Sequence, residues 1–217
     1  LLETALRHIE SCRLCLQRMN DGVNILNSNE KVNRAFRLMN RAMLLQQLHY
    51  SIETRNWIID KGNITGLKDT VIPDINDNST WKPGLGAWRP FQLAFILMNL
   101  NAMLDSSHID REIVDLIWFP TGGGKTEAYL GLSAFTIFLR RLKDKNDSGT
   151  TVLMRYTLRL LTAQQFQRAA SLICACDIIR KENKEELGPE RISIGLWVGG
   201  MTPNERNNNS PQNLGAL

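Results

Sequence analysis

The chain has 217 residues, of which 43% are hydrophobic and 22% are charged, and it carries a formal net charge of +4. These proportions are typical of a folded globular protein and argue against a disordered chain. No apolar run approaches the roughly 20 residues that a bilayer-spanning helix needs. We therefore expect a cytoplasmic protein without membrane contact. The small positive excess is compatible with a nucleic-acid partner but does not by itself indicate one.

Helical periodicity dominates the first part of the chain. Apolar residues recur at spacings of three and four over residues 1–20, which predicts an amphipathic helix that ends at Asn20-Asp21-Gly22. A second helix is expected to begin near Ser28, whose side chain is suited to cap it. Residues 62–86 are rich in Gly, Asn, Asp and Pro and predict a linker or surface loop. The sequence thus predicts a helical N-terminal region over residues 1–61.

Residues 87–217 show a different pattern, in which apolar runs alternate with helical periodicity. Strands are predicted at 113–119, 151–156 and 192–198, and helices at 91–104, 126–142 and 162–181. Strands that are apolar on both faces and alternate with helices predict a parallel sheet covered on both sides. The expected fold class is therefore α/β, with residues 87–217 forming an incomplete domain.

A glycine-rich element follows the first predicted strand. Gly122, Gly123 and Gly124 allow the backbone to curl so that successive N–H groups point at an anion, and the next helix adds its positive N-terminus. Lys125 can reach the β- and γ-phosphates, and the hydroxyl of Thr126 can hold a magnesium ion. The element departs from the general phosphate-loop pattern because Phe119 stands at the first glycine position. We predict a nucleoside triphosphate site.

The form Pro-Thr-Gly-x-Gly-Lys-Thr resembles superfamily 2 helicases and translocases, which commonly lack that first glycine. Three further elements stand in the order found in that family: Arg-Pro-Phe-Gln at 89–92, the stretch at 155–165, and the two glycines at 199–200. The amino-acid sequence of residues 119–132 and 153–166 is similar to that of the large helicase of the bacterial anti-phage DISARM system. Together these elements cover residues 88–200.

The resemblance implies a RecA-like phosphate-loop domain that binds ATP and Mg²⁺, and it assigns roles to residues. The amide of Gln92 would read the adenine edge, Lys125 and Thr126 would act in catalysis, and Thr126 would hold the metal with the nucleotide. The full expected nucleotide set is Gln92, Thr121, Gly122, Gly123, Gly124, Lys125 and Thr126. The expected nucleic-acid contacts are Tyr156, Thr157, Arg159, Gly199 and Gly200.

No Asp-Glu pair of the kind that holds magnesium and orients water in such motors follows Lys125. We therefore expect no hydrolysis by these 217 residues alone. The favoured hypothesis is a DNA-acting ATPase motor whose partners are DNA and a protein of the same defence system. An alternative is a nucleotide-gated scaffold that binds a partner protein without motor activity. A kinase or transferase fits less well, because those enzymes usually keep the first glycine and lack the Gln element.

Overall fold

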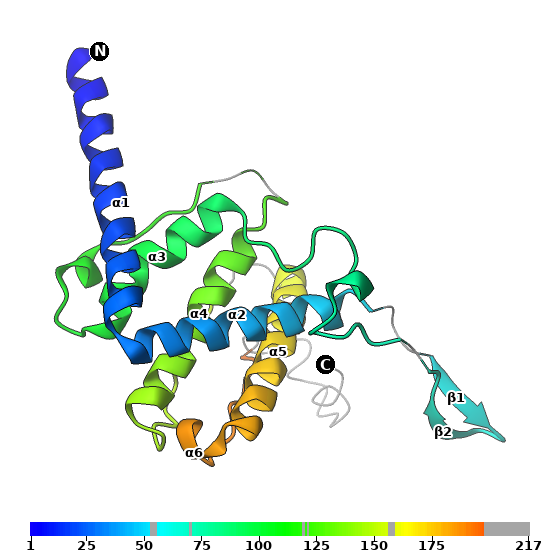
Figure 1. Ribbon diagram of the computed structural model, residues 1–217. Helices are drawn as coiled ribbons and strands as arrows, with labels where there is room; N and C mark the ends of the chain where they lie inside the picture. The colour runs from blue at the N-terminus through cyan, green and yellow to red at the C-terminus, as the bar shows by residue number, and fades with distance from the viewer. Residues whose placement is uncertain (53–55, 70, 119, 121, 156–158, 198–217) are drawn as a thin grey trace, which may run out of the picture.

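A computed structural model describes residues 1–52, 56–69, 71–118, 120, 122–155 and 159–197. Within them the α-helices are α1 (Leu2–Ser28), α2 (Glu30–Tyr50), α3 (Pro90–Leu104), α4 (Lys125–Lys143), α5 (Arg159–Glu182) and α6 (Lys184–Leu187). The strands are β1 (Trp57–Asp60) and β2 (Asn63–Leu67), and the 3-10 helices are η1 (Asn78–Thr80) and η2 (Ile109–Glu112). Figure 1 shows the helices gathered together, with α1 extending beyond them and the β1–β2 hairpin projecting at another side. None of the helices in the described ranges is long and apolar enough to span a membrane.

The hydrophobic core lies between α2, α3, α4 and α5. Met39 of α2, Ile96 of α3, and Phe135 and Phe138 of α4 are fully buried in it, as is Ile179 of α5. Apolar residues on α2 and α4 recur every three or four positions, so each helix turns one continuous face toward its neighbours. The core thus joins α2, from the predicted region 1–61, to α4 and α5, from the predicted region 87–217. The division of the chain into 1–61, 62–86 and 87–217 stays a prediction.

The first helix is longer than predicted. It continues through Gly22 to Ser28 instead of ending at Asn20-Asp21-Gly22. The reason is a close contact between helices: a Cβ added to Gly22 would lie 2.2 Å from the carbonyl oxygen of Leu97 in α3. Glycine therefore serves here to let two backbones approach, not to end the helix.

The residue that caps α2 also differs from the prediction. The side chain of Asn29 accepts a hydrogen bond from the backbone N–H of Val32 at 3.1 Å. The hydroxyl of Ser28 instead donates to the carbonyl oxygen of Asn24, one turn back in α1, at 2.8 Å. Asparagine and serine are equally good caps, and the longer α1 takes up Ser28.

The predicted parallel sheet is wrong. In the part of the chain that the structure describes, the only sheet is the antiparallel pair β1–β2, whose register places Trp57 opposite Leu67 and Ile59 opposite Ile64. The three apolar runs predicted as strands form no strand where they are described, at 113–118, 151–155 and 192–197. A strand requires hydrogen bonds from a neighbouring segment, and apolar composition does not supply them.

Side chains on these extended runs are largely exposed to solvent. Val114 is 93% exposed, Trp118 87%, Leu153 79% and Trp197 92%. A RecA-like sheet would bury such residues between two helical layers. The described residues between 87 and 197 therefore do not form the expected α/β arrangement, although the helices predicted at 91–104, 126–142 and 162–181 correspond closely to α3, α4 and α5.

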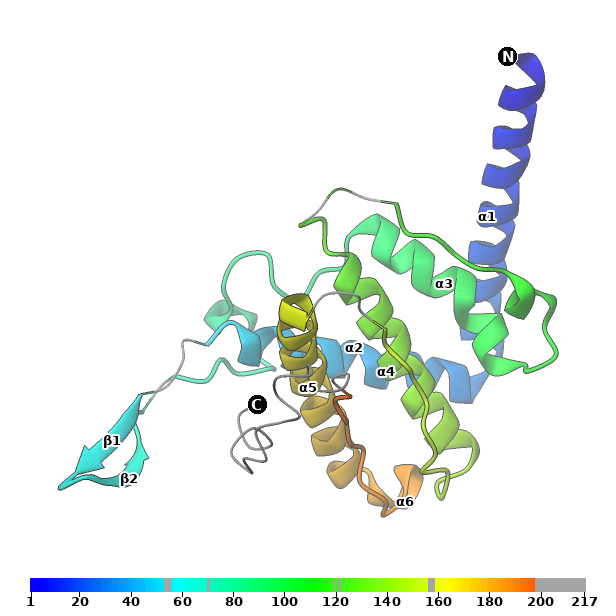
Figure 2. The ribbon, with the colours of Figure 1, turned by 180° about the vertical axis from the view of Figure 1, so that it is seen from behind.

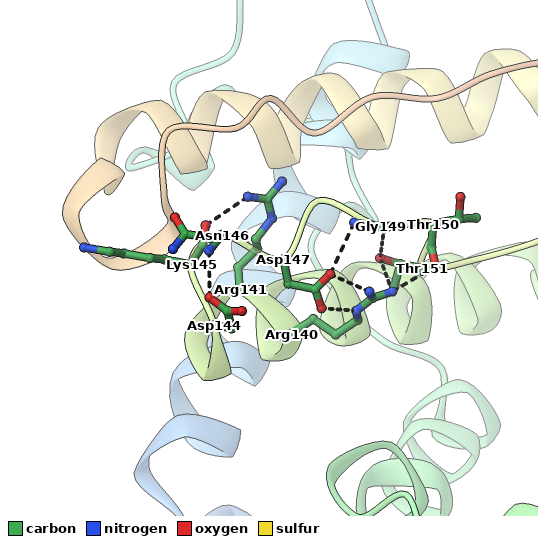
Figure 3. A network of polar contacts seen from close by, with 9 residues as sticks. All are labelled: Arg140, Arg141, Asp144, Lys145, Asn146, Asp147, Gly149, Thr150 and Thr151. Carbon is green, nitrogen blue, oxygen red and sulfur yellow. Dashed lines mark hydrogen bonds and ion pairs between the residues drawn. The ribbon is translucent and has the colours of Figure 1, made fainter.

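The turn after α4 is fixed by one arginine. Arg140 forms a two-pronged ion pair with Asp147, at 2.7 and 2.6 Å, and also donates to the carbonyl oxygen of Thr150 at 2.9 Å (Figure 3). The hydrogen bond from Arg140 holds the pKa of the Asp147 carboxyl below its usual range. This network directs the chain from the end of α4 into the extended residues 151–155.

A cavity of about 910 Å³ lies between α4 and α5. Its walls include the extended stretches 147–155 and 191–197, which Figure 2 shows from behind, running along the two helices. Arg180 of α5 donates to Asp177 at 2.7 Å, and Asp177 accepts from the backbone N–H of Ile192 at 3.1 Å. This contact anchors the start of the second stretch to α5.

Candidate nucleotide-binding site

The glycine loop leads directly into α4. Gly122 and Gly124 have φ angles of 79° and 83°, in the left-handed region that favours glycine, and Gly124 is the residue immediately before the helix. The backbone N–H of Gly123 donates to the carbonyl oxygen of Pro120 at 3.2 Å. Among the described residues beyond its chain neighbours, none has an atom within 4 Å of a Cβ built on Gly122. The loop therefore has an open face at the positive end of a 19-residue helix.

The start of α3 holds the loop from the other side. Gln92, which is only 4% exposed, accepts from the backbone N–H of Arg89 at 2.8 Å and donates to the carbonyl oxygen of Gly124 at 2.7 Å. Arg89 donates to the carbonyl oxygen of Gly123 at 2.7 Å. The side-chain amide of Gln92 thus joins α3 to the loop, and its predicted role at adenine stays a prediction.

Lys125 and Thr126 form the beginning of α4, where the sequence places them. The ammonium group of Lys125 donates to the carbonyl oxygen of Pro120 at 2.9 Å, so it lies over the loop. The hydroxyl of Thr126 donates to Gln165 of α5 at 3.3 Å and accepts from the hydroxyl of Tyr129 at 3.0 Å. The ammonium group of Lys125 thus lies at the loop, whereas the hydroxyl of Thr126 is held between Gln165 and Tyr129.

An ion pair that the sequence did not predict lies beside them. Glu127, the next residue of α4, pairs with Arg168 of α5, and the two side chains are 22% and 24% exposed. The second carboxylate oxygen of Glu127 is buried without a hydrogen-bond partner among the described residues. That oxygen would lie 3.3 Å from a Cβ on Gly124, so it borders the loop.

The chain that enters the loop is anchored by a buried arginine of α1. Arg18, 6% exposed, donates to Asp110 at 2.9 Å and forms a two-pronged pair with Asp115 at 2.8 and 2.9 Å. The hydrogen bond from Arg18 holds the pKa of the Asp115 carboxyl below its usual range. Residues 109–115, which precede the loop, are therefore fixed by charge to a helix more than 90 residues earlier.

The structure brings together most, though not all, of the predicted nucleotide residues. Gln92 and Lys125 contact the loop that contains Gly122, Gly123 and Gly124, and Thr126 follows in the first turn of α4 with its hydroxyl bound to Gln165. Thr121 lies outside the described residues, as do Tyr156, Thr157, Gly199 and Gly200. Arg159 is the first residue of α5. The predicted nucleic-acid surface thus stays a prediction.

Four residues at this site were given no individual role from the sequence, although Arg89 and Gln165 lie in the elements predicted at 89–92 and 155–165: Arg89, Glu127, Gln165 and Arg168. Arg89 and Glu127 lie next to residues of the predicted motifs, so their positions in the sequence could have indicated that they are close to the loop. Gln165 and Arg168 contact Thr126 and Glu127 in the first turn of α4, across 39 and 41 residues of chain. Only the packing of α5 against α4 places them there.

Comparisons with known proteins identify a relative. No protein-family model matches the sequence. The chain is 42% identical over 208 residues to the DISARM protein DrmA of Bacillus paralicheniformis. That alignment takes in 91% of this chain but 17% of the relative, so the chain spans a small part of that protein's length. Over most of its length, this chain is therefore related to a DISARM protein.

Proposed function

We propose that this chain is the ATP-binding part of a superfamily 2 DNA helicase or translocase that acts in anti-phage defence. The observation that carries the proposal is the loop of Gly122 to Gly124 running directly into α4, with Lys125 and Thr126 in the first turn. The kinship with a DISARM protein supports the defence role. The parallel sheet is not part of the proposal.

The local geometry fits a triphosphate with its magnesium ion. The open face at Gly122 leaves room for an anion, and the N-terminus of α4 adds positive potential at the same point. Lys125, now on the carbonyl oxygen of Pro120, would turn to the phosphates, and Thr126 keeps an oxygen lone pair for the metal. Bound magnesium would neutralise phosphate charge during transfer.

The loop's shape is itself under constraint. A Cβ on Gly124 would lie 2.8 Å from the amide nitrogen of Gln92, and the φ of 83° disfavours any other residue. Arg89 and Gln92 hold the loop by its carbonyl oxygens, at Gly123 and Gly124. We infer that these two residues act by positioning the loop, whether or not Gln92 also contacts the base.

The test is ATP hydrolysis by the full-length protein, with and without single-stranded DNA, beside a Lys125→Ala variant. We expect DNA-stimulated turnover that the substitution lowers by at least about 100-fold, since it removes a cation from the phosphates. Absence of nucleotide binding would contradict the proposal. Binding without turnover or any DNA response would instead favour the nucleotide-gated scaffold.

A further inference from the structure

The two residues that follow Lys125 in α4, Thr126 and Glu127, both form contacts with α5. Thr126 donates to Gln165, and Glu127 pairs with Arg168. Gln165 and Arg168 are three positions apart and so share one face of α5. Both contacts are partly buried, which shields them from solvent. The first turn of α4 is therefore set by α5 as well as by its own loop.

The charge of Glu127 requires compensation. Its carboxylate borders Gly124 of the loop that is proposed to receive a triphosphate, and like charges at such a distance repel. One of its oxygens borders the loop and has no hydrogen-bond partner in the described part of the chain, while the other is bound by Arg168. Two other cations adjoin the loop: Arg89 donates to the carbonyl oxygen of Gly123, and Lys125 donates to the carbonyl oxygen of Pro120. Among these cations, Arg168 is the one that forms an ion pair with Glu127.

We propose that Arg168, supported by Gln165, is a positioning residue of the nucleotide site. It cancels the charge of Glu127 and fixes the first turn of α4 so that the loop accepts a triphosphate. The proposal rests on the proposed function. It also makes triphosphate affinity depend on the placement of α5, whose first residue is Arg159, a predicted nucleic-acid contact. A single rigid helix would thereby link the two predicted sites.

The test is the affinity of the full-length protein for a fluorescent non-hydrolysable ATP analogue and for the matching diphosphate, both with magnesium. Arg168→Gln should weaken triphosphate binding about tenfold and diphosphate binding less, because the triphosphate carries more charge toward Glu127. The double variant Glu127→Gln/Arg168→Gln should recover to within about threefold of wild type, because no charge is left uncompensated. Glu127→Gln alone should bind the triphosphate at least as tightly as wild type.

A matched control is Arg41→Gln, which removes another ion pair on α5. Arg41 of α2 pairs with Glu182 at 2.7 Å, far along α5 from Arg168, so its loss should leave both affinities unchanged. A double variant as weak as Arg168→Gln, or a tenfold loss in Glu127→Gln alone, would overturn the proposal and leave Arg168 a packing residue. If wild type bound neither nucleotide, the proposed function itself would fail, which is a separate result.

Discussion

Two kinds of apolar segment in this chain reach opposite outcomes. On α4, Phe135 and Phe138 are fully buried, whereas Trp118 and Trp197 on the extended runs are 87% and 92% exposed. A helix satisfies its own backbone hydrogen bonds, so it needs only a neighbour to cover its apolar face. An extended run also needs a partner for its backbone groups. Local sequence therefore determines the first kind and not the second.

The candidate site lies at the junction of these two kinds of segment. On one side, the loop continues into α4, which is held by the core. On the other, residues 113–118 reach the loop as an unpaired run whose described anchor to the helices includes the buried pair of Arg18 and Asp115. The loop thus depends on packing at its end and on charge at its beginning.

The largest effect is expected from the core. Phe135→Ala should lower the free energy of unfolding by about 3–5 kcal/mol, because it leaves a cavity among α2, α3 and α4. Trp118→Ala should change it by less than about 0.5 kcal/mol, because that side chain is exposed. Urea unfolding followed by circular dichroism measures both. Equal losses of unfolding free energy in the two variants would mean that Trp118 is buried, and the extended runs would then not differ from the helices in burial.

Sequence patterns were informative wherever the structure is local. The bounds of α3 and α4 were predicted to within one residue, and the loop residues Gly122 to Thr126 were placed correctly at the start of a helix. The errors are long-range. The end of α1 depends on how closely Leu97 approaches Gly22, and strand pairing depends on partners elsewhere in the chain. The contacts of Gln165 and Arg168 with the first turn of α4 were not predicted for the same reason.

A smaller effect is expected from the charge anchor before the loop. Arg18→Gln should cost about 2 kcal/mol of unfolding free energy, because it leaves the carboxylates of Asp110 and Asp115 without their cation. The exposed Arg13, which is 3.5 Å from Glu10 on the same helix, is the matched control, and Arg13→Gln should have almost no effect. Similar losses in both variants would show that burial does not strengthen the Arg18 pair.

The same anchor predicts how stability depends on pH. The hydrogen bond from Arg18 lowers the pKa of Asp115 in the folded state. The stabilising contribution is therefore complete above the unfolded value of about 3.9 and is lost as pH falls through the lower folded value. Acid titration of unfolding free energy should fall less steeply below about pH 4 in Arg18→Gln than in wild type. Other carboxylates titrate in both proteins, so only the difference between the two curves reports on Asp115. If the unfolding free energies of wild type and Arg18→Gln fell in parallel, Arg18 would not be what lowers the pKa of Asp115.

The smallest effect concerns the boundary between α1 and α2, where neighbouring candidates for the cap can be compared directly. Asn29→Ala should cost about 1 kcal/mol, because the N–H of Val32 loses its acceptor. Ser28→Ala should cost a few tenths at most, since its hydroxyl bonds within α1. The same denaturation measurement decides between them. A larger loss at Ser28 would mean that Ser28 caps α2, as the sequence predicts, and that α1 ends earlier. A loss confined to Asn29 would confirm that α1 extends to Ser28. The position of the cap would then depend on the packing of α1 against α3, which lets α1 continue through Gly22.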